Sequence, residues 1–168
     1  NLSSDEIIGQ LWISNFYKNN KKTITNVVFM GMGEPLLNFE PVIEAAKIMK
    51  DQFAYGLSRK RITISTSGIV PNIDQLSKNI DVSLAISLHA ADDKLRDEIV
   101  PINKKYPIKL LIESCRNYLM SYENKRSITI EYILIKDIND SLKDAAKVSK
   151  LLSNCLLYTS PSPRDYGT

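Results

Sequence analysis

One stretch, residues 27–38, constrains the fold of this 168-residue chain more than any other. It begins as an unbroken apolar run, which is typical of a strand buried on both faces of a parallel sheet. It ends in Gly31, Gly33, Glu34 and Pro35. Glycine permits φ > 0 and close approach of a ligand to the backbone, and proline restricts the preceding residue to extended conformations. The stretch therefore predicts a buried strand followed by a fixed turn that carries a carboxylate.

This turn follows the carboxyl end of its strand, which is where open α/β sheets and α/β barrels place their sites. The exposed backbone and the Glu34 carboxylate suit recognition of a ligand's ammonium group. A glycine-rich connection between a strand and a helix, with a solvated glutamate, explains the same residues. Taken alone, the motif leaves both interpretations open.

Helical and strand patterns alternate along the chain, which predicts right-handed βαβ units and a parallel sheet. Residues 61–68 and 81–89 each alternate aliphatic with small polar residues, so each predicted strand has one face of either kind. In a barrel, the small faces would line a ligand-filled interior. Strands are expected at 27–31, 61–68, 81–89 and 127–134, and helices at 3–18, from 41, after 71, at 108–119 and at 144–152.

Composition adds only broad limits. The 43% hydrophobic and 24% charged residues describe a globular protein, and the net charge of +3 permits RNA binding without arguing for it. No apolar run approaches the ~20 residues needed to span a bilayer, and the first residues do not read as a secretory signal. The two cysteines, Cys115 and Cys155, form neither a metal-ligand cluster nor a disulfide framework. Cys115 recurs with apolar neighbours at helical spacing, which predicts a core side chain.

The last residues depart from this pattern. Residues 155–165 have no helical or strand period, and they resemble the translation of a transposon-type sequencing adapter. We therefore expect residues 1–154 to be the central part of one core domain. Residues 155–168 are expected to be a non-native, disordered tail.

The segment Gly31-Met32-Gly33-Glu34-Pro35-Leu36-Leu37-Asn38 resembles the signature of the RlmN family of radical S-adenosylmethionine (SAM) enzymes, which methylate carbon 2 of adenosine in ribosomal and transfer RNA. Residues 57–68, 84–90 and 96–106 resemble further segments of that family. The resemblance implies an α/β fold, a partial (β/α)6 TIM-like radical SAM barrel truncated at both ends, with four parallel strands and five helices. The residues that it implies as SAM contacts are Gly33, Glu34, Ser65, Ser87, Leu88 and His89.

The departures from the family pattern concern cysteines. The family binds a [4Fe-4S] cluster through a C-x3-C-x2-C loop, and a second pair of cysteines carries the methyl group and resolves the RNA–protein adduct. Neither set is present in this chain, and nothing here replaces the thiolates that a cluster needs. We therefore expect an internal fragment without catalytic or metal-binding residues, inactive by itself, with the cluster only in the full-length protein.

The resemblance also implies partners. These are SAM, 23S ribosomal RNA with transfer RNA left open as a second substrate, and a reductant protein for the cluster, in a cytoplasmic and monomeric enzyme with no membrane contact. Two alternatives stand beside it: a Cfr-type methyltransferase acting at carbon 8 of the same base, and a non-catalytic nucleotide- or RNA-binding α/β domain. Pro35 and the Leu-Leu-Asn after it favour the carbon-2 enzyme.

Three polar residues have a structural interpretation as well as a functional one. Ser65 and Ser87 could be small residues required by packing, and His89, the single histidine, could be solvated. Glu131 is predicted to face inward, where a carboxylate needs a partner. The sequence does not name that partner.

Overall fold

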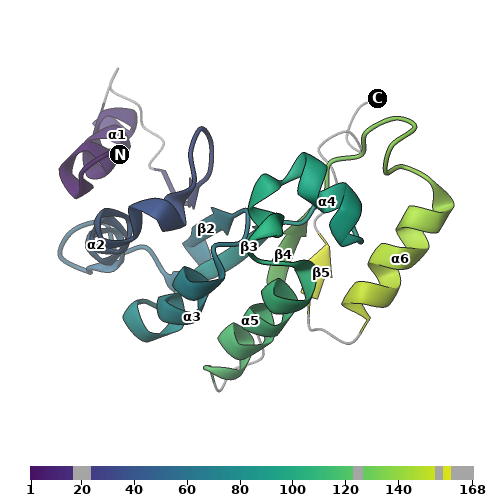
Figure 1. Cartoon of the computed structure of the whole chain (residues 1–168). Coiled ribbons are helices and arrows are strands. Elements are labelled where there is room, and N and C mark those ends of the chain that lie inside the picture. Colours follow the sequence, from purple (N-terminus) through teal and green to yellow (C-terminus); the bar gives the residue numbers. More distant parts are fainter. Residues whose placement is uncertain (17–23, 123–126, 154–156, 160–168) are drawn as a thin grey trace. The chain divides into compact units, whose positions relative to one another are not determined.

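The computed structural model describes residues 1–16, 24–122, 127–153 and 157–159, and the chain divides into two compact units. The first unit comprises Asn1–Thr66 and Gln75–Leu84, and the second comprises Ser67–Asp74 and Ala85–Thr168. Helices and strands alternate through both (Figure 1), and every strand pairing within a unit is parallel. The predicted α/β class with a parallel sheet is confirmed.

The first unit contains two α-helices and two paired strands. Helix α1 (Ser4–Phe16) begins with the predicted capping box: the Ser3 amide donates to the Glu6 carboxylate at 2.8 Å, and the Glu6 amide donates to the Ser3 hydroxyl at 3.2 Å. Helix α2 (Phe39–Lys50) is amphipathic. The residues that α2 buries are Val42, Ile43, Ala45, Ala46 and Met49.

Strands β1 (Val27–Phe29) and β2 (Ile62–Thr66) pair in parallel, with Val27 opposite Ile62. The 3-10 helices η2 (Pro35–Asn38) and η3 (Arg59–Arg61) follow β1 and precede β2. The prediction that β1 is buried on both faces is wrong, because Val28 is 52% exposed. Val28 lines an open hollow beside the strand, and this leaves half of its side chain uncovered.

The second unit holds three parallel strands in the order β3–β4–β5. Strand β3 (Ser83–Ser87) and helix α3 (Val70–Asn79) have residues in both units. Strand β4 (Ile128–Glu131) pairs with β3 and with β5 (Leu157–Thr159). Helices α5 (Ile108–Met120) and α6 (Leu142–Leu152) follow in the same alternation, and α5 buries Cys115 as predicted.

Three elements in the second unit were not expected. The described residues contain six α-helices, whereas five were expected. The additional helix is α4 (Asp93–Ile99), which is followed by the 3-10 helix η4 (Pro101–Lys104). The pattern of α4 gave no signal because Arg96, a charged residue, occupies a fully buried position. Strand β5 lies in the predicted structureless tail; the rest of that tail, with Cys155, falls outside the described residues.

Burial follows the predicted alternation along β3 and into the turn after it. The aliphatic residues on one face are at most 2% exposed, whereas Ser83, Ser87 and His89 on the other face are partly exposed. The aliphatic residues are Val82, Leu84, Ile86 and Leu88. Parallel pairing also brings Ser87 opposite Glu131 on β4, so the polar faces of the two strands are continuous.

Among the described residues, no helix has the length and apolar content that crossing a membrane would require.

Candidate functional site

The turn after β1 is fixed mainly by its own backbone. Glu34 is extended, with φ −111° and ψ 110°, as expected before Pro35, and it caps η2. Its carboxylate Oε1 accepts a hydrogen bond from the Leu36 amide at 3.1 Å, and its carbonyl accepts one from the Leu37 amide at 3.0 Å. The carboxylate is thereby held at the turn, close to its own main chain.

The two glycines of the turn both need conformations that other residues rarely adopt. Gly31 has φ +138° and Gly33 has φ +105°. A Cβ built on either glycine meets nothing within 4 Å. Glycine is therefore required here by backbone conformation, and the space beside the turn is open.

An open hollow of about 810 Å³ lies beside this turn within the first unit. Its lining comes from α1, β1, the turn and α2, and it includes Gly33 and Glu34. A carboxylate at an open, glycine-built rim fits the ammonium group of an amino-acid moiety such as that of SAM. Ser65 is not part of this lining; it lies in β2 and is 5% exposed.

In the second unit, Ser87 and Glu131 lie opposite each other where β3 and β4 end. The Ser87 hydroxyl donates to Glu131 Oε2 at 3.1 Å, which gives the inward carboxylate the partner that the sequence left unnamed. A hydroxyl has one donor hydrogen and two acceptor lone pairs. With its hydrogen directed to Glu131, Ser87 can offer an acceptor to a ligand.

Leu88 and His89 form the turn that follows. Leu88 is fully buried, and its amide donates to the Glu131 carbonyl at 3.0 Å. His89 has φ +57°, a left-handed conformation that is uncommon for residues other than glycine. Its Nδ1 accepts from the Ile133 amide at 3.2 Å, which requires the neutral tautomer protonated at Nε2. Burial lowers the His89 pKa; Glu131 opposes this effect and Arg96 adds to it, so the ring is neutral at pH 7.

Sequence reasoning missed Arg96, which holds this turn from the buried side. Its guanidinium donates to the carbonyls of Ser67 at 2.7 Å, Ser87 at 3.0 Å and Leu88 at 3.0 Å, and to Asn103 Oδ1 at 2.9 Å. Desolvation lowers the Arg96 pKa to about 10, so the group stays charged at neutral pH. Arg96 lies in segment 96–106, which resembles the family. Its role becomes visible only when the fold brings the carbonyls of Ser67, Ser87 and Leu88 to its guanidinium.

The six predicted contacts divide between the two units. Gly33, Glu34 and Ser65 belong to the first unit, and the other three, Ser87, Leu88 and His89, belong to the second. Within the first unit the structure brings Gly33 and Glu34 to one hollow; within the second it brings Ser87 and His89 to one turn beside Glu131. That Glu34, Ser65, Ser87 and His89 face one cavity stays a prediction.

Comparison with known proteins identifies the class to which the chain belongs. Residues 14–148 match the model of the radical SAM superfamily, and the chain therefore belongs to that superfamily. The chain is also similar to a crystal structure described as a radical SAM methyltransferase from Sphaerobacter thermophilus, with a TM-score of 0.88 and 38% identity over 97% of this chain and 49% of that one.

Its similarity to individual relatives is higher. It is 54% identical to the dual-specificity RNA methyltransferase RlmN of Pseudomonas fluorescens over 92% of this chain and 42% of the relative, and 55% identical to that of Pseudomonas putida over 90% and 41%. The chain thus spans about two fifths of the length of the curated relatives that it matches.

The radical SAM family uses SAM and a [4Fe-4S] cluster, and the two groups differ in their fit to this chain. The glycine-built rim with its carboxylate fits SAM. The cluster does not fit, because the sequence has two cysteines and the described part of the chain contains no group of three potential metal ligands. Cys115 is buried in α5.

Proposed function

We propose that this chain is the SAM-binding core of a radical SAM methyltransferase that methylates carbon 2 of adenosine in 23S ribosomal RNA, with transfer RNA as a second substrate. The observation that carries the proposal is the extended Glu34, which caps η2 at the rim of an open hollow. The similarity to relatives named dual-specificity RNA methyltransferase supports RNA as the substrate.

Within this proposal, Glu34 accepts hydrogen bonds from the ammonium group of SAM, and the Gly33 backbone lies beside it. A carboxylate has roughly four acceptor positions, so capping η2 and binding an ammonium group are compatible. The pairing is charge-assisted, which is the stronger class of hydrogen bond. When bound, SAM supplies the methyl group that is transferred.

The second unit would contribute polar groups of opposite kinds. Ser87, whose hydrogen is directed to Glu131, offers an acceptor, and neutral His89 offers a donor at Nε2. Leu88 would contribute through its backbone, since its side chain is fully buried. Ser65 is assigned a contact on the family resemblance, and its small size in β2 is compatible with one.

Further properties of the proposed enzyme rest on the family resemblance. They are a reductant protein that serves the cluster, a cytoplasmic location and a monomeric state. The chain alone is expected to leave RNA unmethylated, because it has no three-cysteine loop for the cluster.

A chimera tests the proposal. Residues 1–154 would replace the matching segment of the Pseudomonas fluorescens relative, and nucleosides of 23S and transfer RNA would be analysed by mass spectrometry in cells lacking their own enzyme. We expect 2-methyladenosine, reduced by Glu34→Gln and unchanged by the exposed control Glu40→Gln. Formation of 8-methyladenosine would indicate the carbon-8 reaction instead. A folded chimera that binds SAM and methylates no adenosine would refute the proposal.

A further inference from the structure

The turn after β3 is held by side chains from two later segments of the second unit. Arg96 donates to the carbonyls of Ser87 and Leu88, both at 3.0 Å, and Asn139 Nδ2 donates to the carbonyl of His89 at 2.8 Å. Arg96 is 0% exposed and Asn139 is 1% exposed. Three successive carbonyls are therefore bound by fully buried side chains.

Both ends of the Asn139 carboxamide make hydrogen bonds. Nδ2 donates to the carbonyls of His89 and Ile133, both at 2.8 Å, and Oδ1 accepts from the Ile135 amide at 2.6 Å. Tyr132 donates its hydroxyl to the Asn139 carbonyl at 3.2 Å. These bonds connect the loop between β4 and α6 to the His89 turn, and both donor hydrogens of the amide are directed at carbonyls.

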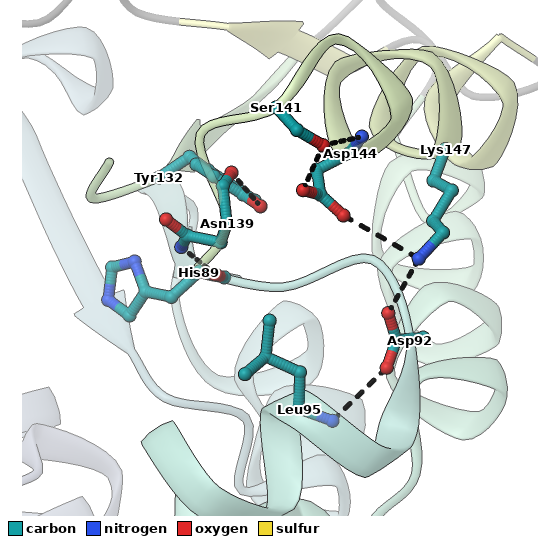
Figure 2. Close-up of polar contacts among 8 residues, drawn as sticks. All are labelled: His89, Asp92, Leu95, Tyr132, Asn139, Ser141, Asp144 and Lys147. Atoms are coloured by element: carbon teal, nitrogen blue, oxygen red, sulfur yellow. Dashed lines mark hydrogen bonds and ion pairs between the residues drawn. The ribbon is translucent and has the colours of Figure 1, made fainter. Parts of the chain in front are cut away.

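The same loop holds the two parts of His89. Asn139 binds the backbone carbonyl, while the Ile133 amide donates to ring Nδ1 at 3.2 Å. Figure 2 shows the His89 carbonyl directed toward Asn139 and the imidazole pointing away from the Asp92 and Lys147 ion pair. A left-handed residue other than glycine persists only where its surroundings hold it. Asn139 supplies the contact that does so at the His89 carbonyl.

We propose that Asn139 is a positioning residue for His89: its carboxamide fixes the left-handed backbone and, through Ile133, the tautomer and direction of the imidazole. The consequence for ligand binding rests on the proposed function, which assigns His89 to the SAM site. If Asn139 only stabilised the loop, loss of its contacts and loss of another contact of the same loop would affect the imidazole equally.

The single histidine makes the imidazole directly observable. Nitrogen-15 NMR of the 168-residue chain distinguishes protonated from unprotonated ring nitrogens, and we expect protonated Nε2 with unprotonated Nδ1. Asn139→Asp keeps the size and the acceptor for Ile135 but turns an oxygen toward two carbonyls. We expect this variant to show mixed tautomers. Tyr132→Phe removes a neighbouring bond of the same loop, and we expect it to keep the wild-type tautomer.

A folded Asn139→Asp chain with the wild-type tautomer would overturn the proposal, and so would an equal change in Tyr132→Phe. If Asn139→Asp does not fold, hydrogen exchange and the imidazole tautomer of the wild-type chain test the proposal. Slow hydrogen exchange of the Asn139 side-chain amide, compared with exposed Asn117, supports the proposal. Exchange as fast as that of Asn117, or a protonated Nδ1, contradicts it.

Titration with SAM separates this proposal from the proposed function. We expect SAM to shift the His89 ring signals in the wild-type chain and to bind Asn139→Asp about 10-fold more weakly, the lower end of what outer partners contribute at metal sites. SAM binding that leaves the His89 signals unchanged would remove His89 from the site, and the tautomer comparison would still decide the positioning role. If folded Asn139→Asp binds SAM with wild-type affinity, the positioning of His89 by Asn139 has no effect on SAM binding.

Discussion

The two turns that carry the candidate site are stabilised in different ways. The Glu34 turn depends on residues within five positions of one another: Gly31 and Gly33 supply positive φ, and Pro35 keeps Glu34 extended. The His89 turn depends on side chains outside it: Arg96, eight positions from Leu88, and Asn139, fifty positions from His89. The first turn is therefore encoded locally, whereas the second exists only when its unit is folded.

The difference has a physical cause. Glycine and proline act on the φ and ψ of their own or adjacent residues, so their effect needs no tertiary contact. His89 carries a side chain in the left-handed region, which its own covalent structure disfavours. Buried donors must offset that cost, and they come from other elements. Loss of a buried donor at the second turn should accordingly cost more stability than a substitution at the first.

The largest effect is expected for Arg96→Met. The change removes the donor of the buried Leu88 carbonyl and of the partly buried carbonyls of Ser67 and Ser87. We expect the free energy of unfolding to fall by about 3–5 kcal/mol, measured by denaturant titration. The exposed Lys109→Met in the same unit should change it by less than about 0.5 kcal/mol. Equal effects of the two substitutions would contradict the role given to Arg96.

Glu34→Gln should act on binding and not on folding. It removes the charge that is proposed to meet the ammonium group of SAM while keeping an acceptor for the Leu36 amide. We expect SAM affinity to fall by about 1–3 kcal/mol in calorimetric titration. The thermal midpoint should stay within error of the wild-type chain. Unchanged affinity would exclude Glu34 from the site.

Gly33→Ala and Gly9→Ala form a matched pair with opposite expected signs. Neither added Cβ meets an atom within 4 Å, so only the backbone distinguishes the two positions. Gly33 has φ +105°, and alanine there should cost about 1–2 kcal/mol. Gly9 lies inside helix α1, where alanine should stabilise by about 0.5–1 kcal/mol. Chemical denaturation of both variants checks the signs, and a stabilising Gly33→Ala would show that positive φ is not required.

The smallest expected effect is a pH dependence from His89. Burial lowers its pKa below the ordinary value of 6.5, so the unfolded chain binds a proton more readily than the folded one. Stability should therefore be unaffected above pH 6.5 and fall as the pH drops from there through the folded pKa. His89→Gln should reduce the dependence of the denaturation midpoint on pH across this range. A wild-type slope that persists in the variant would assign the effect to other groups.

Asp92 responds at a lower pH and provides a contrast. The amide of Leu95 and the Lys147 ammonium lower its pKa below the ordinary 3.8, with burial opposing them. The stability that it contributes is thus present above pH 3.8 and lost as the pH falls through the folded pKa. The effect of His89 begins as the pH falls below 6.5 and that of Asp92 only below 3.8, so the two slopes begin at different pH values.

Much of the fold could be predicted from periodicity. Alternation in 81–89 correctly gave the buried aliphatic and partly exposed polar residues around β3, and the helix of Cys115 was found by its apolar spacing. Helix α4 was missed because a buried arginine has no hydrophobic signature. The apolar run of β1 indicated a strand but not its exposure, because an apolar residue can line a hollow as well as a core.

Sequence patterns also proposed residues of the candidate site, and the roles of these residues stay predictions. The pattern singled out Glu34, Ser87 and His89, and it recognised that inward Glu131 requires a partner. It could not name Ser87 as that partner, because the register of β3 against β4 depends on how the strands pair. Arg96 and Asn139 were missed because they donate mainly to backbone carbonyls, and every residue has one.

The sequence by itself determined the parallel α/β class, the Glu34 turn and the two faces of β3, because these depend on φ and ψ preferences and on periodicity within a few residues. Only the tertiary structure decided the Ser87 and Glu131 pair, the left-handed His89 and the buried donors of Arg96 and Asn139. Such contacts join residues up to fifty positions apart. Their geometry arises from packing, where a buried polar group must find whichever partner the fold brings to it.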